Sequence, residues 1–220
     1  MTSDDKRLKN RLEGGLDELG LRVDESRRER LLALVGLLHK WNRAYNLTAV
    51  RDPEEMVTKH LLDSAAVLPF VTGPTVLDVG AGPGLPGLVL AILAPDLRVT
   101  LLDSNGKKVR FQRQAVMELG LANVSPVQAR VEAFTPPAGG FDQVISRAFA
   151  SLQDFVTLSE SLPSVDGQWL AMKGPAVEDE LGGLPDDVAA VACHELKVPF
   201  EAGSRRLVIL ERTHTTQGRP

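Results

Sequence analysis

The stretch from Val76 to Gly87, VLDVGAGPGLPG, constrains the fold of this chain more than any other. A short apolar run typical of a buried strand leads into four glycines and two prolines, and an apolar helical segment follows. Glycines such as Gly80, Gly82 and Gly84 have no Cβ, so a ligand can approach their main chain closely. Pro83 and Pro86 have no N–H, so the free donors are expected from the glycines, Ala81 and Leu85. The stretch predicts a strand, a ligand-holding turn and a helix, and a tight turn without a ligand is the alternative.

Short apolar runs and helical segments alternate after this turn, which is typical of a parallel sheet covered by helices. The expected strands are 75–79, 98–103, 123–128, 141–147 and 167–173, and the expected helices are 85–94, 107–120 and 152–162. Two further strand-like runs, 191–198 and 205–212, are separated by six residues. A parallel connection needs a dozen or more residues, so these two runs must pair antiparallel. The pattern predicts an α/β, Rossmann-like fold whose seven-stranded, mostly parallel sheet ends in a C-terminal antiparallel hairpin. Residues 213–220 are expected to form a frayed tail.

The first 70 residues have helical periodicity throughout. Apolar residues recur at helical spacing from Leu8 to Leu19, from a cap at Asp24 to Tyr45, and from Met56 to Leu68 before Pro69. We therefore expect an N-terminal helical extension over 1–70 and a ligand-binding domain over 71–220, packed as one compact unit.

Composition excludes several classes of protein. In 220 residues the hydrophobic share is 43%, enough for a sizeable core, and no apolar run is long enough to cross a bilayer. The N-terminus has no signal-peptide core, so we expect a cytoplasmic protein without a membrane partner. The one cysteine, Cys193, allows neither an internal disulfide nor an iron–sulfur cluster, and we interpret it as a small buried hydrophobic residue. Four scattered histidines show no ligand spacing, so no metal site is expected.

The net charge of −4 hides local basic clusters. A local basic face governs binding to phosphates even when the whole chain is mildly acidic. The segment HKWNRAYNLTAVR places Arg43, Asn46 and Arg51 off the apolar stripe of its helix, where they can reach RNA. Further candidates for the same basic face are Lys107, Lys108 and Arg110.

Asp103 ends the second expected strand, about twenty residues past the glycine turn. A carboxylate in this place accepts hydrogen bonds from the ribose hydroxyls of an adenosine cofactor, whereas a cap for the next helix is the alternative. Both a dinucleotide and S-adenosylmethionine fit this pair of features. Pro83 and Pro86 crowd the approach that a pyrophosphate needs, and the chain offers no second mononucleotide half. We therefore favour S-adenosylmethionine, and a nucleotide-dependent oxidoreductase is the rival interpretation.

Arg147 follows the fourth expected strand, where the ligand crevice of an open α/β sheet lies. A cation there suits an acceptor that needs no deprotonation, such as guanine N7, and arginine reads N7 and O6 of guanine bidentately. A structural salt bridge is the alternative for Arg147. Lys173 ends the fifth strand and could neutralise a phosphate or help to hold the base, although a solvated lysine is equally compatible. Arg147 and Lys173 are thus candidate catalytic residues that position the substrate, and a non-enzymatic RNA-binding protein is the second rival.

Together these segments carry a resemblance that extends from about Leu31 to Leu210. HKWNRAYNLTAVRDPEEMVTKHLLDS, LDVGAGPGLPG, LLDSNGKKVRFQRQ, VQARVEAF, FDQVISRAFASL and AMKG closely resemble the RsmG family, also called glucose-inhibited division protein B. The resemblance implies a class I methyltransferase that forms 7-methylguanosine in bacterial 16S ribosomal RNA from S-adenosylmethionine. It also implies cofactor contacts at Gly80, Leu85, Asp103, Val131, Glu132 and Arg147, to which the turn itself adds Gly82 and Gly84. We expect a monomer that acts on 16S rRNA, on the small ribosomal subunit or on an assembly intermediate.

Overall fold

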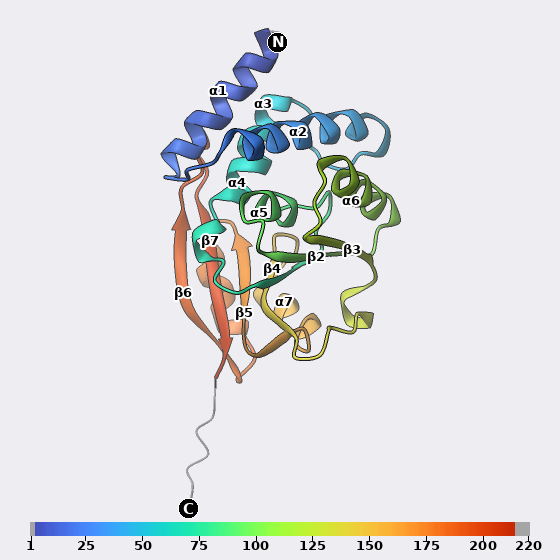
Figure 1. Ribbon diagram of the computed structural model, residues 1–220. Coiled ribbons are helices and arrows are strands. Elements are labelled where there is room, and N and C mark those ends of the chain that lie inside the picture. The colour runs from blue at the N-terminus through green and yellow to red at the C-terminus, as the bar shows by residue number, and fades with distance from the viewer. Residues whose placement is uncertain (1–2, 214–220) are drawn as a thin grey trace, which may run out of the picture.

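The computed structural model describes residues 3–213 (Figure 1). Within this range seven strands form one sheet in the order β3-β2-β1-β4-β5-β7-β6. The strands are β1 Thr75–Val79, β2 Arg98–Asp103, β3 Val124–Gln128, β4 Phe141–Ser146, β5 Pro163–Lys173, β6 Val188–Leu196 and β7 Arg205–Arg212. The strand order reverses between β1 and β4, and ligands bind at such a switch point in open α/β sheets.

The directions of the strands confirm the predicted fold class. All pairs from β3 to β5 are parallel, whereas β7 runs antiparallel to both β5 and β6. The hairpin strands 191–198 and 205–212 therefore pair as expected, and β7 lies between β5 and β6. Pro126 lies inside β3, which is possible because β3 is an edge strand that pairs only with β2.

Helices cover both faces of the sheet and enclose two apolar cores (Figure 1). On one face lie α5 (Gly87–Leu93), α6 (Gly106–Leu119) and the N-terminal helices, and their buried residues form the larger core. On the other face α7 (Leu152–Leu158) contributes Leu152, Phe155 and Val156 to a second core around Trp169. Sequestering both faces leaves the carboxyl ends of the parallel strands as the place for polar chemistry.

The N-terminal extension packs on the sheet domain through α2. The extension consists of α1 (Ser3–Glu18), α2 (Glu25–Tyr45), α3 (Pro53–Met56), a π-helical turn η1 (Val57–Leu62) and α4 (Asp63–Ala65). Asp24 caps α2 by accepting a hydrogen bond from the N–H of Arg27, as predicted. The Trp41 ring on α2 stacks on Tyr45 and meets the edge of Phe111 on α6, with ring centroids 5.8 Å apart. The boundary at residue 70 stays a prediction.

The helix expected from Met56 to Leu68 is present, but with other bounds and an irregular middle. It runs without a break from Pro53 to Ala65, with the π-helical turn Val57–Leu62 between α3 and α4, and a 3₁₀ turn follows at Leu68–Phe70. Three buried polar side chains in this segment bond to other elements: Thr58 to Arg11, His60 to Thr48, and Asp63 to Arg147. These contacts come from tertiary structure, so the helical periodicity of the sequence carries no sign of them.

The interpretation of Cys193 as a buried residue is also wrong. Cys193 lies exposed on β6, the edge strand of the sheet, where alternate side chains face solvent. Residues 214–220 of the expected tail lie outside the described part of the chain.

His60 is a buried histidine held in its neutral form. Its Nδ1 lies 3.0 Å from the carbonyl oxygen of Lys59, so Nδ1 carries the hydrogen and donates it. Its Nε2 then accepts from the hydroxyl of Thr48 at 2.8 Å. Burial, followed by the positive charge of Arg147, lowers the pKa of His60 from 6.5 to about 4. The lowered pKa of His60 predicts that the folded chain loses stability in acid.

Replacement of His60 tests this sensitivity. The pKa of His60 is lower in the folded state than in the unfolded state. The contribution of neutral His60 to stability is therefore complete above pH 6.5 and is lost as the pH falls towards 4. The wild-type chain should lose about 3 kcal/mol more unfolding free energy over this range than His60→Gln does, at 1.36 kcal/mol per pKa unit. Urea unfolding at several pH values measures the difference, with His39→Gln, in the same extension, as the matched control. Parallel pH profiles for the wild type and His60→Gln would contradict the assignment.

Candidate functional site

The turn after β1 is anchored to the end of β2. The N–H groups of Gly80 and Ala81 both donate to the carbonyl oxygen of Leu102, at 2.9 and 3.1 Å. Gly82, in the left-handed region at φ 58°, donates its N–H to Oδ2 of Asp103 at 2.8 Å. The carbonyl of Gly82 accepts from the buried amide of Gln112 on α6, also at 2.8 Å. These hydrogen bonds fix the turn against both β2 and α6, the helix that follows β2.

The expectation that this turn offers free N–H donors is wrong. Pro83 and Pro86 have no N–H group. Every other N–H group from residue 80 to residue 88 donates to an acceptor within the chain, and these donors are Gly80, Ala81, Gly82, Gly84, Leu85, Gly87 and Leu88. The turn coils on itself, so the carbonyl of Ala81 alone accepts from Gly84 and Leu85. A ligand would therefore find carbonyl oxygens and the bare Cα of Gly80 here.

Asp103 is a buried carboxylate whose orientation is set by two main-chain donors. Oδ2 accepts from Gly82 and Oδ1 accepts from the N–H of Asn105, both at 2.8 Å. Each carboxylate oxygen keeps one further lone-pair site for another donor. The alternative role as a helix cap is wrong, because Asn105 caps α6 by accepting from Lys107 and Lys108. Asp103 is thus free to bind a ligand in a defined orientation.

Loops at the carboxyl ends of four strands surround a cavity of about 350 Å³, which we call the adenosine cavity. It gathers four of the predicted cofactor residues, Gly80, Asp103, Val131 and Glu132, and also the predicted RNA contact Lys108. Its size falls in the range of small-molecule sites. Gly80 has φ 66°, and a Cβ there would lie 2.9 Å from that of Ala148. Only glycine therefore lets the first and fourth loops approach this closely.

The other predicted cofactor residues lie outside the lining of this cavity. Gly82, Gly84 and Leu85 are buried in the turn behind it, and the side chain of Leu85 belongs to the larger core. These three residues shape the turn, and none of them contributes a side chain to the lining of the cavity. Arg147 lines a different cavity, described next.

A second cavity, of about 280 Å³, is lined by five cations, and we call it the basic cavity. It brings together the two predicted substrate-positioning residues, Arg147 and Lys173. Three cations that the sequence analysis did not assign complete it: Lys59, Arg205 and Arg206. The only sequence signal for the last two was their place in a short basic run.

Both predicted positioning residues are held by contacts within the chain. Arg147 donates to Oδ2 of Asp63 at 3.0 Å and to the carbonyl of Lys59 at 3.3 Å, so the salt bridge considered as its alternative role exists. Lys173, 11% exposed, bonds Glu180 at 2.8 Å and the carbonyls of Phe149 and Ala150. Lys173 is therefore not a solvated surface lysine.

Asp63 and Asp78 are buried carboxylates that sequence reasoning missed. Asp63, on α4, accepts from Arg147 through one oxygen and from Arg205 through the other, at 3.0 and 3.2 Å. Asp78, on β1, accepts from the N–H of Gly87 at 2.8 Å and so fixes the far end of the turn. Burial raises the pKa of Asp78 to about 7, against the lowering effect of that hydrogen bond. An acid within the apolar run of β1 was the one available signal for Asp78.

The predicted RNA contacts form two groups. Arg43 and Asn46 are exposed near the end of α2, and Arg51 bonds Asn46 at 2.7 Å and the carbonyl of Asn42 at 3.2 Å. Lys107 and Arg110 lie on α6 and line a broad depression of about 770 Å³ together with Tyr45, Arg113, Gln114 and Met117. The second group combines cations with an aromatic ring, which suits single-stranded nucleic acid.

Among residues 3–213, no three histidine, cysteine or acidic side chains are grouped so that they could hold a metal ion. Within the same residues, no helix is both long and apolar enough to span a membrane.

Solved structures share the fold of this chain. TrmN from Thermus thermophilus matches with a TM-score of 0.56 and 22% identity, over 78% of this chain and 53% of its own. A SAM-dependent methyltransferase from Aquifex aeolicus matches with a TM-score of 0.55 and 19% identity, over 78% of this chain and 96% of its own. At these identities the likeness concerns the fold.

Sequence relatives are much more similar. A protein of Chromohalobacter salexigens named ribosomal RNA small subunit methyltransferase G is 65% identical over 92% of this chain and 96% of its own length. A protein of the same name from Aeromonas hydrophila is 50% identical over 95% of this chain and 97% of its own. The family model described as rRNA small subunit methyltransferase G (GidB) matches residues 27–209. These matches confirm the resemblance found in the sequence, and the chain belongs to the rRNA small subunit methyltransferase G family.

Proposed function

We propose that this chain transfers a methyl group from S-adenosylmethionine to N7 of a guanine in bacterial 16S ribosomal RNA. The observation that carries the proposal is the pair of neighbouring cavities, one built around Asp103 and one lined by Arg147 and Lys173. The relatives' printed name, ribosomal RNA small subunit methyltransferase G, supports RNA as the acceptor. The choice of N7 rests on the family resemblance and on the chemistry of the basic cavity.

The residues of the adenosine cavity fit an adenosine-containing methyl donor. Asp103 has lone pairs available for ribose hydroxyls, and its two main-chain donors hold it in place. Val131 offers an apolar side chain to the adenine ring, and Gly80 lets the loop that carries Ala148 close against the turn and complete the cavity. When bound, S-adenosylmethionine supplies an electrophilic methyl group on a sulfonium centre.

The basic cavity suits an acceptor that has no proton to lose. Among the residues that line it, Asp63 is the one carboxylate, and Arg147 and Arg205 already engage both of its oxygens. A free general base is thus absent from the lining, and guanine N7 attacks through a lone pair and needs none. Arg147 and Lys173 then act by holding the guanine nucleotide in line with the donor, so positioning carries the catalysis.

Finer features of the proposal concern the working state of the protein. We propose that it acts as a monomer in the cytoplasm, on naked 16S rRNA, the small ribosomal subunit or an assembly intermediate. The groups Arg43, Asn46 and Arg51 and Lys107, Lys108 and Arg110 would contact the RNA around the target. No metal or membrane enters the reaction as proposed.

Asp103→Asn tests the cofactor role. Both carboxylate oxygens face N–H donors, so the amide group of asparagine must turn an NH₂ towards one of them. The dissociation constant for S-adenosylmethionine should rise about tenfold or more, consistent with the roughly 1–3 kcal/mol cost of an unmatched buried donor. Isothermal titration calorimetry gives the value, with exposed Asp96→Asn as the matched control. An unchanged dissociation constant for Asp103→Asn would refute the role.

Methyl transfer itself tests the proposed function. The wild-type chain should move tritium from the methyl group of S-adenosylmethionine into 16S rRNA or small subunits, and nucleoside analysis should find the label in 7-methylguanosine. Asp103→Asn should slow the reaction at low cofactor concentration and recover with excess cofactor. Label in another nucleoside would overturn the choice of N7, and NADH binding without RNA labelling would favour an oxidoreductase. RNA binding without labelling of any substrate would favour a non-enzymatic protein.

A further inference from the structure

The basic cavity is assembled from four parts of the chain that are distant in sequence. Lys59 comes from η1 of the extension, Arg147 from the loop after β4, Lys173 from the end of β5, and Arg205 and Arg206 from the start of β7. Lys173 and Arg206 are direct cross-strand partners in the antiparallel pair β5–β7. Like charges placed opposite each other on a sheet repel, so this arrangement costs stability unless anions lie close to both side chains.

Asp63 orients two of the cations in the basic cavity and is itself buried. Its side chain is 4% exposed and bonds one guanidinium through each oxygen, Arg147 on one side and Arg205 on the other. A guanidinium has five N–H donors, so both arginines keep donors for a further acceptor. The extension therefore aligns two arginines that come from different parts of the sheet domain, the loop after β4 and the start of β7.

The positive charge of the cavity is only partly matched. The carboxylates that pair with the remaining cations lie outside its lining: Glu55 with Lys59 at 2.9 Å, Glu180 with Lys173 at 2.8 Å, and Glu178 with Arg206 at 3.8 Å. Glu178 is 61% exposed, so its long contact with Arg206 is weak. The Nε of Arg206 is buried and has no acceptor among the described residues. An orphaned guanidinium donor beside four other cations calls for an anionic oxygen.

We propose that the basic cavity binds a phosphate of the RNA backbone next to the target guanosine, and that Lys59 and Arg206 are ligands of this phosphate. The inference rests on the proposed function and deepens it, because it names how the substrate is held. Arginine and lysine donors converging on a small cavity are the usual means of recognising a phosphate.

The position of the basic cavity relative to the adenosine cavity fits this use. The two cavities have no lining residue in common, yet the segment 147–149 separates them as a wall: Arg147 lines the basic cavity, and Ala148 and Phe149 line the adenosine cavity. Lys173 fixes this wall by donating to the carbonyls of Phe149 and Ala150 at 3.2 and 3.0 Å. A nucleotide whose phosphate lies in the basic cavity can therefore direct its base along this wall towards the methyl donor.

The salt dependence of RNA binding tests the proposal without any methyl transfer. We would measure binding of the full chain to 16S rRNA by filter binding between roughly 50 and 200 mM salt. Lys59→Gln and Arg206→Gln should each weaken binding roughly 3- to 10-fold and lower the steepness of the log–log salt plot by about one, as expected for one lost phosphate contact. Arg206→Lys, which keeps the charge, should retain the wild-type steepness.

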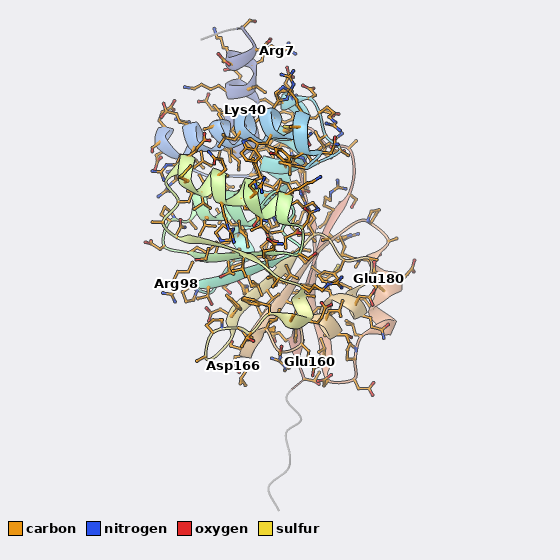
Figure 2. The ribbon with its side chains drawn as sticks, turned by 90° about the vertical axis from the view of Figure 1, so that its right-hand side faces the viewer. Arg7, Lys40, Arg98, Glu160, Asp166 and Glu180 are labelled. Carbon is orange, nitrogen blue, oxygen red and sulfur yellow. The ribbon has the colours of Figure 1, made fainter. Side chains whose placement is uncertain are left out.

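Arg98→Gln is the matched control. Arg98 is exposed at the start of β2, the opposite end of the parallel strands from the two cavities. Figure 2 shows Arg98 and Glu180, the partner of Lys173, on opposite sides of the molecule. The Arg98→Gln substitution removes one arginine charge and should leave the affinity for RNA and the salt slope unchanged. Equal losses for Arg98→Gln and Arg206→Gln would show that total charge decides binding and would overturn the proposal.

Calorimetry distinguishes the other sources of an anion. S-adenosylmethionine should bind Lys59→Gln and Arg206→Gln as tightly as the wild type, and a common loss would assign the cavity to the carboxylate of the cofactor instead. If inorganic phosphate binds the wild type but neither variant, and both variants bind RNA as the wild type does, the basic cavity is instead a site for free phosphate. If the wild type transfers methyl groups but the two variants keep the wild-type salt slope, this inference alone is refuted. If the two variants have lower salt slopes but the wild type transfers no methyl group, the proposed function alone is refuted.

Discussion

The carboxylate of Asp103 joins the two loops on which the rest of the site depends. It accepts from Gly82 in the turn after β1 and from Asn105 at the start of α6, both at 2.8 Å. Gly82 in turn accepts from the buried amide of Gln112, so turn, strand and helix form one hydrogen-bonded unit. Because the N–H groups of the turn all have acceptors within the chain, the groups left to recognise a ligand here are the carboxylate of Asp103 and the shape of the cavity.

The extension is part of the site as well as a cover for the sheet. Its π-helical turn supplies Lys59 to the basic cavity, and Asp63, just after that turn, aligns Arg147 and Arg205. The same segment buries His60 beside Arg147, whose charge contributes to the low pKa of that histidine. Extension and sheet domain therefore share buried electrostatic contacts, and the orientation of Arg147 in the basic cavity depends on a helix outside the sheet.

Periodicity and turn chemistry were enough to predict the strands, the antiparallel hairpin and the carboxylate at the end of β2, because each depends on local residue patterns. The π-helical turn inside the helix expected from Met56 to Leu68 was not predictable, because sequence periodicity shows neither this turn nor the distant partners of Thr58 and Asp63. Asp63 lies 84 residues from Arg147 and 142 from Arg205, so no local pattern joins them. Sequence alone does not show the internal acceptors of the glycine turn, so it predicts free N–H groups where the structure has none.

The central claim is that the cavity beside Asp103 holds the methyl donor. A crystal structure of the chain with S-adenosylmethionine tests it most directly. The account predicts density for the adenosine in this cavity, with ribose hydroxyls donating to both oxygens of Asp103 and the adenine ring packed on Val131. Density for the donor elsewhere on the protein, with Asp103 still bonded only to Gly82 and Asn105, would contradict it.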